Sequence, residues 1–447
     1  MKKRLAFFFL GILILFSVIY LFRYKRALVF EGMVPNSATE IIHVNLRQIE
    51  HHVLTDAIKN PLKYIDFKFS EEKKGSLILK KTISIPRNIF FYTNDRKFKD
   101  IWISSFIKVK KKKELSDYLI RDGFVKSNDE GIMLFRKLNL VLAIKGKRLV
   151  VAFKTDNHAA ISSVVNEIFE EESFLSETSD VLNAIMTAKN DISYATLAND
   201  FVEANFKNGL LEVLGTFSSD LFFASKQGDF SKNSQGYISA KINKQHKLFQ
   251  RLITEGNSRK FNDFTKLSID SIMSKWNGSF AFNLKSINSE IDTIVTYDYD
   301  DDFNKIEKVA VQELTVPAID FSLNADTNLF GYLLKENAIQ IIDSDTLFTS
   351  IPLYKLYANS TTTTLNISSQ KYFSGFLVKE NKMKLNAHFN IEKYMQKPLE
   401  FSFLPTKNKY LQLIKDTSIM YATDDKLSVK VVLKNSERNF IGQFVKP

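Results

Sequence analysis

The sequence predicts an α+β protein: an N-terminal transmembrane helix followed by an ectodomain of mainly antiparallel sheet. One apolar stretch at the amino end predicts the helix. Downstream, strand and helix patterns come in blocks rather than in strict alternation, which favours antiparallel sheet. Two similar segments, 44–49 (VNLRQI) and 282–287 (FNLKSI), suggest two related halves. We therefore expect an anchor at 1–26, a first α+β half at 27–225 and a more β-rich half at 226–447.

The apolar stretch from Leu5 to Phe22 predicts that the lipid bilayer is a partner of this protein. It has no charge, and fourteen of its eighteen residues are Leu, Ile, Phe or Val. Such a helix is about 27 Å long, close to the hydrocarbon core of roughly 30 Å. Residues of these types favour insertion at mid-membrane.

The alternative to an anchor is a cleaved signal peptide, which has a shorter apolar core and a small-x-small cleavage site. No such triplet follows here. The basic residues on the two sides are balanced: Lys2, Lys3 and Arg4 precede the stretch, and Arg23, Lys25 and Arg26 follow it. Because long domains translocate largely regardless of charge, we expect a single-pass protein in the cytoplasmic membrane with its C-terminal domain outside the cytoplasm, in the periplasm.

Composition narrows the function classes. The 447 residues are 45% hydrophobic and 25% charged, which is typical of a globular protein. Six of the twelve net positive charges lie in the first 26 residues, so the rest is too weakly basic for a nucleic-acid partner. The absence of Cys excludes disulfides, thiolate zinc sites and Cys nucleophiles.

In the first half, Asn45 stands between a strand at 38–44 and a helix at 46–58, where it can cap the first helical turn. Pro61 ends that helix. Gly123 closes a helix at 114–121, and Lys-Gly-Lys at 145–147 predicts a hairpin turn. The other expected strands are 88–93, 101–109, 132–135, 140–144 and 148–153, and an amphipathic helix with its N-cap at Asp156 or Asn157 runs to Phe169.

Farther along, helices are expected at 180–188, 200–211, 244–254, 264–275 and 327–336. Strands are expected at 280–284, 291–299, 309–316, 318–323, 418–422, 427–433 and 439–445, with a hairpin of 372–378 and 383–391 and a helical stretch at 408–416. Asn45, Asn283, Asn366 and Asn390 each follow an apolar residue in a recurring pattern. We expect each to end a strand, where Asn can bond its neighbouring backbone.

Two short motifs carry a resemblance to a family. The first consists of Pro35, Asn36, Ser37, Ala38, Ile41, Val44, Asn45 and Leu46. It resembles the opening of exported, membrane-anchored Bacteroidota proteins grouped as domains of unknown function, where P-x-x-A-x-x-[IV]-x-x-[VI]-[ND] follows the anchor. The segment from Trp276 to Phe280 (WNGSF) is similar to their x-G-x strand start. The resemblance implies an envelope location and α+β repeats, and it transfers no catalytic residue.

Histidines and acids offer candidate metal ligands. His51 and His52 are adjacent, and neighbours on a helix project about 100° apart, so we expect a solvated helix surface rather than a shared metal. His43, His158, His246 and His388 are scattered and are expected to be structural. Asp298, Asp300, Asp301 and Asp302 supply hard oxygens, but a calcium loop starting at Asp298 would need Gly and Glu where Phe303 and Val309 stand. An acidic strand end is expected, with adventitious calcium as the alternative.

The densest basic run is Lys108 with Lys110, Lys111, Lys112 and Lys113. It lacks the interleaved aromatic residues that stack on bases. We expect a solvated turn, with contact to anionic lipid or envelope polysaccharide as the alternative.

No nucleophile-elbow, dinucleotide-binding or P-loop motif is present. We therefore assign no catalytic, cofactor-binding or metal residue and expect no cofactor; this weighs against an enzyme without deciding the matter. The sequence predicts an anchored envelope protein whose ectodomain binds or scaffolds another envelope protein or polysaccharide. The alternatives are an anchored hydrolase of polysaccharide or peptide, which needs two acids about 5–10 Å apart in a cleft, and a lipid-handling protein with an apolar groove.

Overall fold

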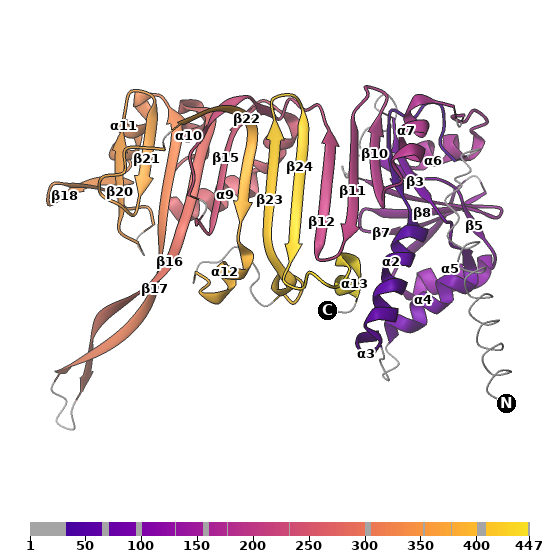
Figure 1. Ribbon diagram of the computed structural model, residues 1–447, viewed down its shortest axis with the longest axis horizontal. Helices are drawn as coiled ribbons and strands as arrows, with labels where there is room; N and C mark the ends of the chain where they lie inside the picture. Colours follow the sequence, from indigo (N-terminus) through magenta and orange to yellow (C-terminus); the bar gives the residue numbers. More distant parts are fainter. Residues whose placement is uncertain are drawn as a thin grey trace, which may run out of the picture. The chain divides into compact units, whose positions relative to one another are not determined.

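The computed structural model describes residues 33–64, 71–94, 101–129, 131–154, 161–176, 178–231, 233–299, 305–351, 354–376, 378–399 and 408–445. The molecule is an α+β protein dominated by antiparallel sheet (Figure 1), which confirms the α+β, mainly antiparallel part of the predicted fold class. The expected anchor, from Leu5 to Phe22, lies outside these residues. Within the ranges given above, no helix has both the length and the apolar character needed to cross a bilayer.

The chain forms two compact units. The first comprises residues 1–208 and 438–446, and the second comprises residues 209–437. The C-terminal segment thus belongs to the same unit as the N-terminal half. That the two halves of the sequence are related by duplication stays a prediction.

The sheet of the first unit has the order β11-β10-β1-β3-β4-β9-β8-β7-β6, and every neighbouring pair is antiparallel. β5 pairs with β9, and β2 pairs with β5. The strands are β1 (Glu40–Val44), β2 (Ile83–Ser84), β3 (Ile89–Thr93), β4 (Ile101–Ser104), β5 (Ile107–Val109), β6 (Val125–Asp129), β7 (Ile132–Lys137), β8 (Leu140–Lys145), β9 (Arg148–Lys154), β10 (Ile192–Thr196) and β11 (Phe201–Lys207).

Both faces of this sheet are apolar because alternate residues of each strand point to opposite sides. Phe90 belongs to a core that includes α6 and α7, whereas Phe135 belongs to a second core that includes α5. The helices of the unit are α2 (Leu46–Lys59), α3 (Pro61–Tyr64), α4 (Glu71–Thr82), α5 (Lys112–Arg121), α6 (Ile161–Glu170), α7 (Asp180–Ala188) and α13 (Phe440–Val445). The predicted inward face of α6 is confirmed, since Val165 and Ile168 are buried.

The sheet of the second unit has the order β12-β24-β23-β22-β15-β16-β17-β21-β20-β19-β18, again antiparallel throughout. Its strands are β12 (Leu210–Thr216), β13 (Phe222–Phe223), β14 (Ser225–Gly228), β15 (Gly236–Ile242), β16 (Trp276–Tyr299), β17 (Lys305–Ala325), β18 (Ile339–Ile342), β19 (Asp345–Phe348), β20 (Leu356–Ser360), β21 (Thr364–Ser368), β22 (Val378–Phe389), β23 (Ile414–Ala422) and β24 (Lys426–Leu433). Its helices are α8 (Lys247–Leu252), α9 (Glu255–Thr265), α10 (Ile269–Lys275), α11 (Thr327–Lys335), α12 (Ile391–Gln396) and the 3₁₀ turn η1 (Leu411–Leu413).

Four expected elements are wrong. The helical stretch expected at 408–416 contains only the 3₁₀ turn η1, and strand β23 already begins at Ile414. The helix expected at 200–211 consists of strand residues of β11 and β12, with Gly209 between them at φ 59°. The hairpin expected from strands 372–378 and 383–391 does not form. Residues 371–376 are not strand, and β22 runs without a turn from Val378 to Phe389, where it pairs with β14, β15 and β23. The strand expected at 439–445 is helix α13. In each case pairing or packing with residues distant in sequence overrides the local pattern.

The recurring Asn pattern has two outcomes. Asn45 and Asn390 follow a strand and cap a helix, accepting hydrogen bonds from Gln48 N at 3.0 Å and Lys393 N at 2.8 Å. Asn283 and Asn366 instead lie inside β16 and β21, so the expectation that they end strands is wrong.

Candidate functional site

The histidines do not converge on a metal site. The structure shows no group of three or more His, Asp or Glu side chains that could hold a metal within its described ranges. His43 is buried, its Nε2 lies 2.9 Å from Asn88 Oδ1, and its burial lowers its pKa despite this bond. His52 is only partly exposed to solvent, and its Nε2 lies 2.9 Å from Oδ1 of the buried Asp191 side chain. His246 caps α8 through a bond from Leu248 N.

Of the acidic candidates, Asp298 lies in β16 opposite Ile306, and Asp300, Asp301 and Asp302 lie outside the described residues, as does His158. His388 lies in β22, where its ring centroid is 5.7 Å from that of Tyr237.

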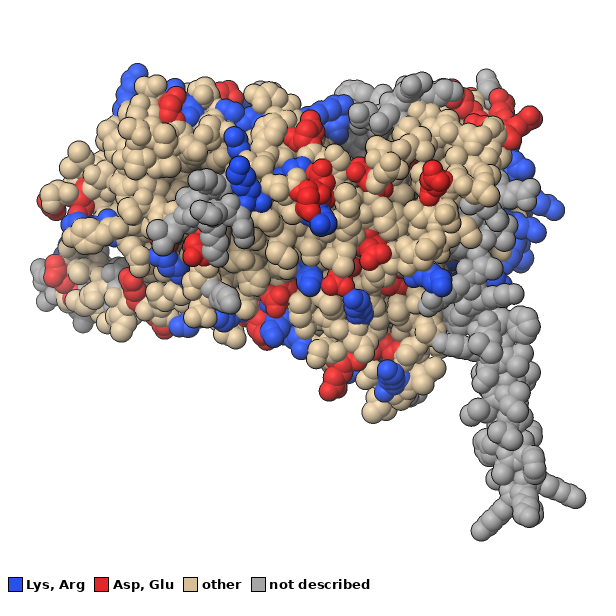
Figure 2. Space-filling view, turned by 45° about the horizontal axis from the view of Figure 1, so that its top comes forward, with Lys and Arg blue, Asp and Glu red and all other residues tan. Residues whose placement is uncertain are grey.

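The basic run is larger in space than in sequence. Lys108 of β5 lies opposite Arg148 of β9, and Val109 N donates a hydrogen bond to Lys147 O at 2.8 Å. Lys147 and Arg148 of the β8–β9 hairpin therefore enlarge the basic surface around the lysine run. Only the pairing of β5 with β9 reveals this, because the two segments are far apart in the sequence. Asp and Glu lie among Lys and Arg over most of the face in Figure 2, as expected of a solvated surface.

An apolar pocket of about 390 Å³ lies between one face of the second unit's sheet and helices α9, α10 and α11. Phe321 and Leu323 of β17 and Leu365 of β21 are among its sheet residues. Thr265 supplies the one polar side chain of the lining, and its hydroxyl donates to Phe261 O within the same helix at 2.7 Å. The pocket therefore offers a ligand apolar contact and no polar partner.

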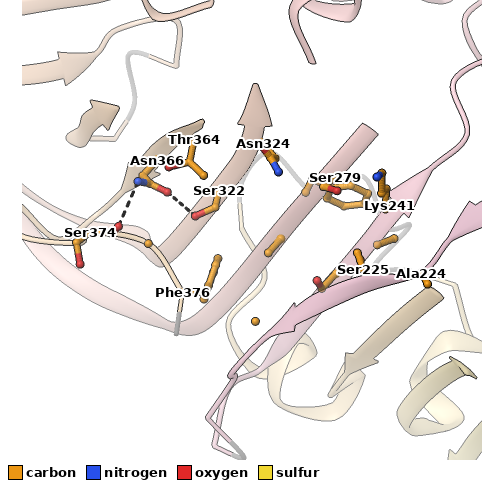
Figure 3. Close-up of a pocket in the computed structure, with 16 residues that line it drawn as sticks. Ala224, Ser225, Lys241, Ser279, Ser322, Asn324, Thr364, Asn366, Ser374 and Phe376 are labelled. Carbon is orange, nitrogen blue, oxygen red and sulfur yellow. Dashed lines mark hydrogen bonds between the residues drawn. The ribbon is translucent and has the colours of Figure 1, made fainter. Parts of the chain in front are cut away.

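A polar pocket of about 470 Å³ lies on the other face of the same strands. Strand alternation explains the contrast. Ser322 and Asn324 point into the polar pocket, whereas the intervening Leu323 lines the apolar one. Figure 3 shows Thr364 and Asn366 from β21 beside these side chains, with Phe376 below them.

One wall of the polar pocket is fixed by Asn366. Its Oδ1 accepts from Ser322 Oγ at 2.6 Å, and its Nδ2 donates to Ser374 O at 3.4 Å (Figure 3). The Nδ2 also donates to Asn359 Oδ1 at 3.0 Å. With its amide satisfied in this way, Asn366 orients the pocket rather than meeting a ligand.

Four other polar residues, Ser239, Ser279, Asn324 and Lys241, also line this pocket. Lys241 Nζ lies 6.0 Å from the centroid of the Phe223 ring. Neither pocket includes Asp, Glu or His in its lining. The two pockets therefore contain side chains for binding and no carboxylate pair for acid–base hydrolysis.

No protein-family model and no curated protein matches the chain. Among solved structures, crystal form I of TP0453 matches with a TM-score of 0.25 at 9% identity, over 77% of this chain and 93% of that chain. Crystal form III of TP0453 matches with a TM-score of 0.24 at 11% identity, over 77% of this chain and 94% of that chain. Values this low transfer neither function nor residue roles.

Proposed function

We propose that this protein is a membrane-anchored envelope protein whose second unit binds an acyl chain of a lipid in the apolar pocket. The observation that supports the proposal is the pocket's lining, which is apolar apart from a hydroxyl already bonded within α9. Its volume of about 390 Å³ falls in the range of small-molecule sites. It is well over twice the ~150 Å³ apolar cavity that takes up one benzene.

The energetics of the cavity also favour an apolar guest. Water cannot fill it at low cost, because a buried water needs two to four polar partners. An acyl chain in the pocket would remove apolar surface from water, which is favourable by about 0.8 kcal/mol for each buried CH₂ group.

Helix α8, which precedes α9 in the chain, and α9 itself expose further apolar side chains. Leu248 and Leu252 of α8 are exposed and lie one helical turn apart on the same face. Phe264 of α9 is exposed next to the lining residue Thr265. These side chains suit contact with a bilayer surface, where an acyl chain would be exchanged.

The predicted anchor complements this activity. A bilayer-spanning helix from Leu5 to Phe22 would keep the pocket close to a source of lipid, on the outer side of the cytoplasmic membrane. The membrane span and its orientation are predicted from the sequence, independently of the pocket.

Photo-crosslinking of the full chain in its native membrane tests the proposal. The probe is palmitate carrying a diazirine near the end of its chain, and labelled peptides are identified by mass spectrometry. We expect labelling of peptides from α9, α10 and β17. Leu323→Trp, which fills the pocket, should reduce that labelling at least tenfold. Asn324→Trp is the matched control, because the adjacent side chain points to the opposite face.

Labelling restricted to peptides that contain residues 5–22 would refute acyl-chain binding and leave only lipid contact with the anchor. Equal loss of labelling in both Trp variants would also refute it. Hydrogen exchange of β17 checks that each variant keeps its sheet.

The polar pocket favours a second candidate function, the binding of an envelope saccharide. Hydroxyls and an amide beside Phe280 and Phe376 can bond sugar hydroxyls and stack on a sugar ring. In this case Asn324→Trp should abolish binding of a saccharide probe, whereas Leu323→Trp should leave it intact.

A further inference from the structure

Strands β16 and β17 continue together well beyond the sheet of the second unit (Figure 1). The pairing of β16 with β15 ends at Leu284, and β21 meets β17 only from Asp320 onward. Residues 288–299 and 305–316, here named the arm, therefore pair only with each other among the described strands. A two-stranded ribbon without further packing is marginally stable in water.

One face of the arm exposes a stripe of large apolar side chains. Directly opposed residues of an antiparallel pair lie on the same face, and the register opposes Ile291 with Glu313, Thr293 with Val311, Val295 with Val309, and Tyr297 with Glu307. The exposed fractions on this face are 78% for Ile291, 70% for Val311, 61% for Val309, 53% for Tyr297 and 48% for Val295. Five large apolar side chains thus form a contiguous exposed stripe, which marks an interaction surface.

We propose that this stripe is covered by the arm of a second copy of the chain. The two arms pack face to face and run in opposite directions about a two-fold axis through the pair Val295–Val309. This interface is isologous, since the same patch is used on both copies. It converts two marginal ribbons into two packed layers with an apolar interior.

Of the three charged residues on this face, Lys305, Glu307 and Glu313, two form an opposite-charge pair in this arrangement. Five pairs of opposed residues face the same way, and Val295–Val309 is the middle one. A two-fold axis there brings the outermost pair, Tyr299–Lys305, over the innermost pair, Ile291–Glu313, of the other copy. β17 then lies over β17, so that Lys305 of each arm meets Glu313 of the other. Arms that run in the same direction lack this match, because Lys305 would lie over Tyr299.

A bilayer fits the arm less well. A single hairpin in hydrocarbon leaves both outer edges with unpaired backbone groups. The arm also carries Glu290, Asp292, Asp298, Glu307 and Glu313 against Lys305 and Lys308, a net negative charge that anionic headgroups repel.

Sedimentation velocity of the full chain in mild detergent, with charge-reversed variants, tests the proposal. We expect a dimer. Glu313→Lys and Lys305→Glu should each raise the dimer dissociation constant at least tenfold, because like charges then face each other. The double variant E313K/K305E should return it to within about threefold of the starting protein. These surface substitutions should leave the fold intact, as hydrogen exchange of β16 and β17 can verify.

Thiol cross-linking gives an independent readout, because the chain has no Cys. Val309→Cys places two thiols at the axis, and a short bifunctional maleimide should join two copies. The matched control is Ile306→Cys, which is 48% exposed on the opposite face of the same strand and should cross-link poorly. A monomeric chain, a double variant that stays monomeric, or equal cross-linking at both positions would overturn the proposal. The inference does not rest on lipid binding, so its failure leaves the proposed function untouched.

Discussion

At the residue scale, the first unit depends on a buried ion pair that joins its two chain segments. Asp56 of α2 accepts hydrogen bonds from Arg438 Nη2 at 2.9 Å, Tyr64 Oη at 2.7 Å and Asn439 N at 3.2 Å. Burial opposes the charge of Asp56, but the bonds from Arg438 and Tyr64 outweigh it and lower the pKa of the carboxyl group. Burial and the bond to Asp56 raise the pKa of Tyr64 to about 12.

We expect Asp56→Asn to lower the free energy of unfolding of the first unit by about 3–5 kcal/mol, because it leaves a buried guanidinium without its counter-charge. Denaturant titration monitored by hydrogen exchange in α2 would measure the loss. Replacing both partners, with Asp56→Leu and Arg438→Met, should recover most of it. A loss below about 1 kcal/mol in the single variant would contradict this role.

The same pair gives the stability a defined pH dependence. The unfolded pKa of Asp is about 3.9, and the folded value lies below it. The contribution of Asp56 is therefore fully present above that unfolded value and is lost as pH falls through the folded pKa. Asp56→Asn should remove this part of the acid sensitivity, which denaturant titrations at pH values around the unfolded pKa of Asp would measure.

At the scale of elements, the strand–Asn–helix junction recurs in both units. Asn45 joins β1 to α2, and Asn390 joins β22 to α12, each with a side-chain bond to the backbone N–H three residues on. The local sequence predicted the first junction correctly, because a capping bond depends only on neighbours. The same pattern at Asn283 failed, because β16 pairs with β15 and β17 on either side of it.

We expect Asn45→Ala to destabilise the first unit by about 1 kcal/mol, whereas Asn45→Asp should be nearly neutral, since Asp also caps well. Asn390→Ala should have a similar effect on α12. Hydrogen exchange of the first turn of each helix would report the loss locally. An equal loss for Asn45→Asp and Asn45→Ala would show that the side-chain oxygen does not act as a cap.

At the scale of the whole molecule, the chain leaves the first unit at residue 208 and returns to it at residue 438. The returning helix α13 packs against α2. The approach is close at Gly442, where a Cβ atom would lie 2.5 Å from Asp56 Oδ2. The last residues are therefore part of the N-terminal unit's structure.

We expect a chain that stops after Glu437 to lose stability in the first unit and to keep it in the second. Truncation removes both Arg438 and α13, which leaves buried Asp56 without its cation. Hydrogen exchange should rise in α2, with little change in β22 and β23. Uniform loss of protection in both units, or none in α2, would contradict this division.

Properties that depend on neighbours along the chain could be determined from sequence alone. These are the α+β class, the caps at Asn45 and Gly123, the 145–147 turn and the apolar face of α6. The apolar run from Leu5 to Phe22 is of the same kind, and its membrane role stays a prediction.

Only the tertiary structure decided where distant residues meet. It placed Phe201–Lys207 in a strand and joined Asp56 to Arg438. It also set one pocket with many polar side chains and one apolar pocket on the two faces of β17, and it left the arm, among the described strands, paired only with itself. The physical reason is that strand pairing, burial and cavities arise from contacts between residues far apart in sequence, and a single sequence records no such pairing.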